Sequence, residues 1–317
     1  MEGGGEYFII SRSFGLNIGS TIGIALFLSQ AISVAFYVIA FTEAFEFLFN
    51  YILNSFGFIL PRQVISIPVM LLLAVLILSK GATLGVKALY VVVVVLFVSL
   101  ILFFLGNTGY AETSGFGLMN AQLRNPNQFF IVFAIIFPAF TGMTAGVGLS
   151  GDLKNPSKSI PLGTTLATAS GMIIYVFVVW KLAKSATVED LLEHQLIMSR
   201  IALAGVVAIP LGLAASTISS ALGSIMVAPR TLQALALDQT FPSVRLNSWL
   251  GKESEKNNEP VNASLVTSIV AMVFVALGNV NAVASVITMF FLVTYGSLCL
   301  ISFLNHFGSS PSYRPSF

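Results

Sequence analysis

Eight long apolar runs divide this chain, and they constrain its fold more than any other feature. Their approximate limits are residues 15–48, 63–80, 86–106, 129–150, 160–181, 200–228, 261–278 and 283–305. A helix needs about 20 apolar residues to cross the hydrocarbon core of a membrane, and these runs are of that order. Because backbone polar groups in hydrocarbon must be bonded within the protein, we expect an all-α membrane protein with about eight transmembrane helices.

Composition supports this class and excludes several others. Of the 317 residues, 56% are hydrophobic and only 9% are charged, whereas soluble domains carry about 25% charged residues. The net charge of +2 is small and spread along the chain, so nothing favours nucleic acid as a partner. The single cysteine, Cys299, excludes an internal disulfide or a cysteine metal cluster. We expect one transmembrane domain over residues 1–317, with the lipid bilayer as its partner.

Lysine and arginine predict the orientation, because short loops rich in them stay in the cytoplasm. If loops alternate between the two sides, ten of the 15 basic residues share the side of both termini. The N-terminus and C-terminus are therefore expected to be cytoplasmic, and acidic residues 188–194 to form a short amphipathic segment outside. The first run carries Glu43 and Glu46 near its end, so it is either strongly tilted or leaves the membrane before these acids. The sixth is expected to continue past residue 228 as an amphipathic surface helix.

The fourth run is interrupted by a proline, two threonines and three glycines: Pro138, Thr141, Gly142, Thr144, Gly146 and Gly148. Irregular backbone at mid-membrane depth is tolerated only where protein, ions or water satisfy it. The break therefore predicts either an ion site or a proline kink packed against small-residue neighbours. Carbonyls before Gly142 and the Thr141 hydroxyl suit an alkali cation, and amides from Gly142 onward suit an anion such as chloride.

Hydroxyl groups inside other apolar runs are further candidates. Adjacent Ser219 and Ser220 lie about 100° apart on a helix, which suits part of a sodium shell, although such hydroxyls also bond to carbonyls of their own helix. Tyr37 and Tyr295 lie mid-span, away from the interfaces where membrane tyrosines concentrate. A buried phenol needs a partner, and a structural hydrogen bond is the alternative to an ion.

Six stretches of the sequence resemble the cation-chloride cotransporters of the amino acid-polyamine-organocation superfamily. FPAFTGMTAGVGLSGDLKNPSKSIPLGT resembles the sixth span and following loop of that family, and EYFIISRSFG with SVAFYVIAFTEA resembles the start of the third span. STISSALGSIMVAPRTLQALALDQTFP resembles the eighth span and the next helix, FFLVTYGSLCLISF the tenth span, and SPSYRPSF the pattern after it. The matches keep their order over essentially the whole chain.

The resemblance implies three ion sites. The potassium-binding groups that it implies are Tyr37, the Pro138 carbonyl and Thr141. The chloride-binding groups are the amides of Gly142, Met143 and Thr144 together with the Tyr295 hydroxyl. The sodium-binding candidates are Ser219 and Ser220, which match the serine pair of the sodium-coupled branch, and Ser216, which stands where members often have alanine.

Family members carry an inverted five-plus-five core plus two further spans and a cytoplasmic regulatory domain, and the resemblance covers spans three to ten. It implies secondary active cotransport of chloride with potassium and sodium, with these transported ions in place of any cofactor. Without spans one and two, which supply half of each ion site, we expect the chain to be inactive alone.

Two alternatives to a cation-chloride cotransporter stay open, and a third is disfavoured. One is an amino-acid or polyamine permease on the same scaffold, and another is a non-transporting membrane scaffold that associates as a homodimer or with a full-length homologue. An enzyme or a transition-metal site is not expected, because the two histidines, His194 and His306, are too few to build a His-based centre.

Overall fold

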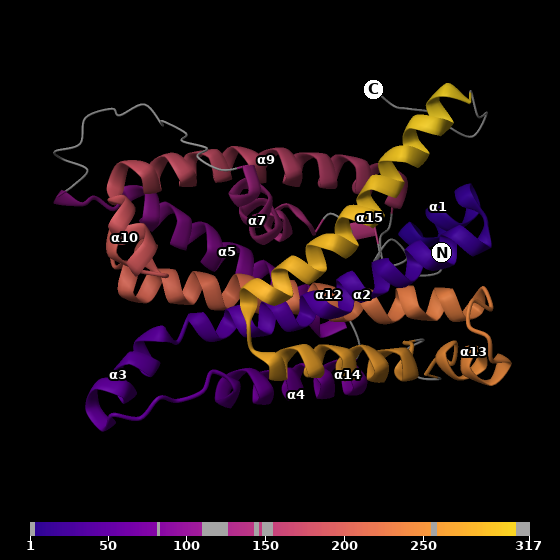
Figure 1. Cartoon of the computed structure of the whole chain (residues 1–317), viewed down its shortest axis with the longest axis horizontal. Coiled ribbons are helices and arrows are strands. Elements are labelled where there is room, and N and C mark those ends of the chain that lie inside the picture. The colour runs from indigo at the N-terminus through magenta and orange to yellow at the C-terminus, as the bar shows by residue number, and fades with distance from the viewer. Residues whose placement is uncertain are drawn as a thin grey trace.

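The computed structural model describes residues 4–80, 83–109, 126–142, 146–147, 155–254 and 259–308. The elements within these ranges are helices, one of them a 3-10 turn, and no strand occurs among them (Figure 1). The all-α class expected from the apolar runs is therefore confirmed.

Each predicted run contains all or most of one long helix. These helices are α2 (Leu16–Glu43), α4 (Gln63–Lys80), α5 (Thr83–Leu105), α7 (Pro126–Ile136) with the 3-10 turn η1 (Phe137–Phe140), α9 (Pro156–Ser185), α12 (Gly205–Leu237), α14 (Val261–Leu277) and α15 (Val280–Phe307). Of these, α2, α9, α12 and α15 are long and apolar enough to cross a membrane by length and composition, and the others are shorter apolar helices.

Shorter helices connect these spans: α1 (Gly5–Phe14), α3 (Glu46–Phe56), α10 (Val188–Glu193), α11 (Ile197–Ile201) and α13 (Val244–Leu250). The first apolar run is two helices rather than one tilted helix, since α2 ends at Glu43 and α3 begins at Glu46. The acidic segment expected to be a short amphipathic loop segment forms the helix α10. Its start is fixed by a capping box, in which the Thr187 hydroxyl accepts a hydrogen bond from the Asp190 amide at 3.1 Å.

The prediction of a surface helix after residue 228 is wrong. The chain continues within α12 as far as Leu237, and Ala228, Leu232 and Leu235 are fully or almost fully buried. These side chains pack in one apolar cluster with Tyr7 and Leu26. Packing on a second helix, and not exposure to water, decides where this segment lies.

The core of the structure is built around α2 and α12. Figure 1 shows α2 and α12 running through the centre, α15 crossing them, α4 and α14 on one side, and α9 at the opposite edge. One large apolar cluster joins α2, α4, α12, α14 and α15 through residues that include Ile39, Met70, Ile225, Val275 and Ile287. In contrast, no residue in the most apolar 18-residue stretch of α9 is buried against the described part of the chain.

Helix α1 folds back along α2, and the turn between them needs Gly15, whose φ of +81° lies in the left-handed region. Two glycines of α2 allow the close approach. A Cβ on Gly23 would lie 2.5 Å from the Tyr7 ring, and a Cβ on Gly19 would lie 2.5 Å from the Ser11 Cα. The lack of a side chain at Gly19 and Gly23 of α2 therefore decides how closely α1 docks.

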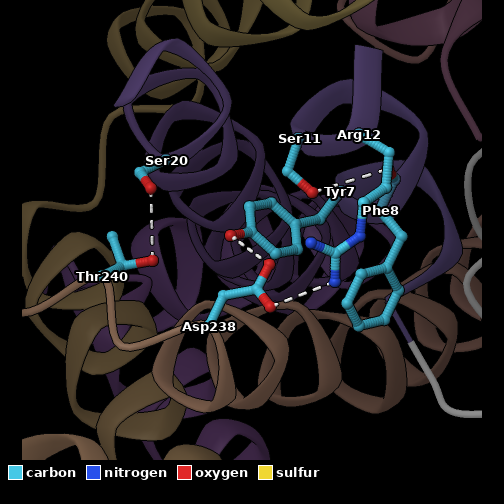
Figure 2. A network of polar contacts seen from close by, with 7 residues as sticks. All are labelled: Tyr7, Phe8, Ser11, Arg12, Ser20, Asp238 and Thr240. Carbon is cyan, nitrogen blue, oxygen red and sulfur yellow. Dashed lines mark hydrogen bonds and ion pairs between the residues drawn. The ribbon is translucent and has the colours of Figure 1, made fainter. Parts of the chain in front are cut away.

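Polar contacts hold α1 and the start of α2 to the C-terminal end of α12 (Figure 2). Asp238 accepts a hydrogen bond from the Tyr7 hydroxyl at 3.0 Å and pairs with Arg12 at 3.3 Å. The hydroxyls of Ser20 and Thr240 lie 3.3 Å apart. One carboxylate therefore serves two side chains of α1.

Replacing Asp238 by alanine is expected to destabilise the protein by about 1–3 kcal/mol, because the buried Tyr7 hydroxyl loses its acceptor. Arg12→Gln is the matched control. The Arg12 side chain is 63% exposed, so its ion pair contributes about 0.2–1 kcal/mol. Thermal unfolding in detergent measures both variants, and equal losses would contradict the assignment of the larger effect to Tyr7.

Candidate functional site

The interruption expected in the fourth run is present in the backbone. Helix α7 ends at Ile136, continues for one 3-10 turn as η1, and then leaves helical geometry at Thr141, whose φ and ψ are −88° and 166°. Gly142 follows with φ of +121°, a conformation that favours glycine. The Thr141 amide donates to the Pro138 carbonyl at 3.2 Å and its hydroxyl donates to the same oxygen at 2.7 Å.

The structure brings the three expected potassium-binding residues together. Pro138 is buried in η1, and its carbonyl lies beside the Thr141 hydroxyl. The Tyr37 side chain comes from α2, about 100 residues earlier in the chain, and lies close to the Thr141 side chain. Carbonyl and hydroxyl oxygens without a carboxylate suit a monovalent cation, whose hydration shell neutral oxygens can replace.

Of the expected chloride-binding residues, Met143 and Thr144 lie outside the described residues. Gly142 is exposed beside the break. Tyr295 reaches the break from α15, with its ring 6.4 Å from that of Phe137 in η1. Helix α15 is also bonded to α7, since the Thr288 hydroxyl donates to the Ala134 carbonyl at 2.6 Å.

The expected sodium-binding serines lie on α12, and two of them bond within their own helix. The Ser216 hydroxyl donates to the Leu213 carbonyl at 3.0 Å, and the Ser219 hydroxyl donates to the Ser216 carbonyl at 2.9 Å. This is the structural alternative left open by the sequence. A hydroxyl that donates in this way keeps lone pairs that can face a cation, so the geometry allows both roles. Ser220 lies on the same helix and is half-buried.

One residue at the break was not singled out from the sequence. The Tyr175 hydroxyl of α9 donates to the Ala139 carbonyl at 3.0 Å, and its ring lies 4.9 Å from that of Phe140. The signal was available, because Tyr175 is also a tyrosine in the middle of an apolar run, like Tyr37 and Tyr295.

A cavity of about 510 Å³ lies beside the break, between η1 and α9. Thr141, Gly142 and Tyr175 contribute to its lining, and Gly163 and Gly171 of α9 form part of the opposite wall. Among the described residues, a Cβ on either of these two glycines would meet no atom within 4 Å. The break therefore opens onto a space lined by glycines and hydroxylated side chains together with the larger apolar Phe140, Ile160 and Met172.

Comparison with known proteins agrees with this arrangement. The amino acid permease family profile matches residues 1–317. Solute carrier family 12 member 8 from Mus musculus is 36% identical over 191 residues, which cover 59% of this chain and 26% of the relative. Members 2 and 1 of solute carrier family 12 from Mus musculus are each 29% identical over alignments that cover 100% of this chain and 30% and 33% of the relatives.

The chain spans about a quarter to a third of the length of the curated relatives that it matches. These matches confirm the resemblance to cation-chloride cotransporters that the motifs indicated, and they agree with the apolar helices in describing an integral, multi-pass membrane protein. The profile match over residues 1–317 shows that the chain belongs to the amino acid permease family.

Proposed function

We propose that this chain forms the ion-binding core of a secondary transporter that moves chloride together with potassium and sodium. One observation carries the proposal: the Thr141 hydroxyl and the Pro138 carbonyl meet at the broken backbone of the fourth span, and Tyr37 lies close to Thr141. Similarity to solute carrier family 12 over the full chain supports ion cotransport. Helix rocking around a fixed, broken span is the form of motion that such scaffolds use.

The break can bind a cation and an anion cooperatively. We assign the cation to the Pro138 carbonyl and the Thr141 hydroxyl, and the anion to the amides from Gly142 onward. At an assumed separation of about 7 Å and an effective dielectric of about 20, two opposite unit charges attract by about 2.4 kcal/mol. Bound chloride then tightens potassium binding about 50-fold without any buried carboxylate.

The finer parts of this proposal concern sodium, orientation and assembly. We assign the sodium site to the serine pair Ser219 and Ser220, and both termini to the cytoplasm on the basis of the basic loops. The chain acts in the bilayer as one transmembrane domain, as a homodimer or beside a full-length homologue. It needs no cofactor other than the transported ions, and catalysis of a chemical reaction is not part of its function.

An amino-acid or polyamine permease is the second candidate. The profile that matches the whole chain is that of amino acid permeases, and the cavity beside the break has the glycine-rich wall that a carboxylate and an amine would need. The two candidates differ in which solutes stabilise the purified protein.

Potassium chloride is expected to raise the thermal unfolding temperature of the purified chain, because a ligand that binds only the folded state stabilises it. Thr141→Val is expected to abolish the potassium-dependent part of this rise by removing one cation ligand. Tyr295→Phe is expected to reduce the chloride-dependent part. The measurement is thermal unfolding with potassium, sodium or N-methylglucamine as the cation and chloride or gluconate as the anion.

Thr267→Val is the matched control for the threonine variant, since Thr267 is buried on α14 and its hydroxyl donates to its own helix at 2.8 Å. It should lower the unfolding temperature in all salts without changing the potassium increment. Unchanged increments in both break variants would sink the ion assignment. Stabilisation by amino acids or polyamines, with none by salts, would instead favour the permease.

A further inference from the structure

A carboxyl group lies on the buried face of α1. Glu6 is 4% exposed, and its Oε2 atom is buried with no hydrogen-bond partner among the residues that the structure describes. Its neighbours Tyr7 and Ile10 on the same helix are fully buried. An ionised carboxylate in such a place costs several kcal/mol unless it is paired, so the neutral form is favoured. Burial raises the pKa of Glu6 to about 8.

The elements packed against α1 do not offset this burial. Helix α2 has no charged residue before Glu43. Its titratable side chains, Tyr37 and Glu43, lie 14 and 20 residues beyond Gly23, which Tyr7 contacts, and this corresponds to about 20 Å and 30 Å along a helix.

The charged groups of α12 nearest to α1 are already engaged. Arg230 pairs with Glu259 at 3.3 Å, and Asp238 at the end of the helix pairs with Arg12 at 3.3 Å. On α15 the titratable groups are Tyr295, Cys299 and His306. None of these groups shifts the pKa of Glu6, which is raised by burial away from water.

Helix α1 joins three spans of the core. Tyr7 packs with Leu26 of α2 and Leu235 of α12, and the Gly4 that precedes α1 lies against Ala234 and Arg230 of α12. One turn further along α1, Ile10 packs with Ile301 of α15. A change in the docking of α1 therefore alters its packing contacts with α2, α12 and α15 together.

We propose that Glu6 is a proton-binding site that controls the docking of α1. With the carboxyl protonated, α1 stays against α2, α12 and α15, and loss of the proton releases it. The released helix exposes the carboxylate to water and gives up the Tyr7 and Ile10 contacts. Because α15 also carries Tyr295, proton binding at Glu6 acts on the helix that reaches the broken span.

The direction of the pH dependence follows from the two states. In the released state the Glu6 carboxyl has its ordinary pKa of 4.5, and in the docked state its pKa is about 8. Between these values the docked state holds one more proton, so docking weakens by up to about tenfold for each pH unit of rise. Below pH 4.5 docking is at its strongest, and above pH 8 it weakens no further.

Hydrogen exchange of the full chain in lipid nanodiscs tests this proposal. The protection of amides in residues 5–14 is measured from pH 5 to pH 9.5 and corrected for the intrinsic exchange rate at each pH. In the wild type we expect protection to fall by up to about tenfold per pH unit until about pH 8 and then to level. In Glu6→Gln, which keeps the shape of the side chain and cannot ionise, protection should not change with pH.

Three variants separate Glu6 from its titrating surroundings. Arg12→Gln should lower protection by the same factor at every pH and keep the slope, whereas Cys299→Ala and His306→Gln should leave the profile unchanged. Equal slopes in the wild type and in Glu6→Gln overturn the proposal. A flat wild-type profile also overturns it without any variant, and Glu6→Met replaces Glu6→Gln if the amide variant does not fold.

Discussion

Gly106→Ala is expected to destabilise the protein by about 3 kcal/mol or more, because the packing at this position leaves no room for a methyl group. Gly106 follows the last residue of α5, where the chain meets α11. A Cβ at this position would overlap the Ile201 carbonyl oxygen and lie 2.8 Å from the Ala202 Cα. Both are backbone atoms, so the overlap cannot be relieved by turning a side chain.

The overlap also disturbs two polar contacts. The Leu203 amide donates to the Leu102 carbonyl at 3.0 Å, and the Lys181 ammonium donates to the Gly106 carbonyl itself at 2.6 Å. Separating α5 from α11 stretches the first bond and reorients the second. Thermal unfolding in detergent and the monodisperse yield after solubilisation measure the loss.

Gly109→Ala is the matched control, since a Cβ on Gly109 would meet no atom within 4 Å. It is expected to change stability by about 0.5 kcal/mol or less. Comparable losses in the two variants would mean that glycine is needed for chain flexibility and not for close packing.

Gly23→Ala is expected to destabilise the docking of α1 by about 2 kcal/mol, after allowing for the helix propensity that alanine adds to α2. The new Cβ would lie 2.5 Å from the Tyr7 ring and 2.9 Å from a Leu235 methyl group. Relief requires Tyr7 to move, and its hydrogen bond to Asp238 is then lost. Faster hydrogen exchange in α1, with α14 unchanged, is the measured sign.

Gly171→Ala is the control for this substitution. Gly171 is also inside a long helix, α9, but a Cβ there would meet no atom within 4 Å. The substitution is expected to be neutral or to stabilise by up to about 1 kcal/mol through helix propensity. If Gly23→Ala left the exchange of α1 unchanged, the close approach of α1 to α2 would not be a determinant of docking.

The apolar runs predicted the helices well because each run follows local rules of length and hydropathy. The break at Pro138 to Gly142 was likewise visible, since proline and glycine interrupt a helix wherever they stand. The meeting of Tyr37 with Thr141 is different. The two residues are about 100 positions apart, and only the family resemblance placed them together before the structure did.

The error in α12 has a specific cause. Arg230, Thr231 and Gln233 made the segment after residue 228 resemble a surface helix. In the structure Thr231 donates to Gln30 at 2.8 Å, and Gln233 donates to Glu253 at 2.9 Å. A polar side chain is expected to be exposed when its partner lies far away in the sequence, because the pairing that allows its burial is not visible there.

The sparse attachment of α9 has a mechanical consequence. Near its end, Lys181 and Ser185 are bonded to the segment after α5, through the Gly106 carbonyl at 2.6 Å and the Thr108 hydroxyl at 2.7 Å. Towards its middle, the Tyr175 hydroxyl donates a hydrogen bond to the Ala139 carbonyl, one residue from Pro138. A rigid helix that is bonded at separate points transmits a movement of one point to the other. Tilting α9 about its end therefore pulls on the main chain of the break, and the oxygens to which we assign potassium move with it.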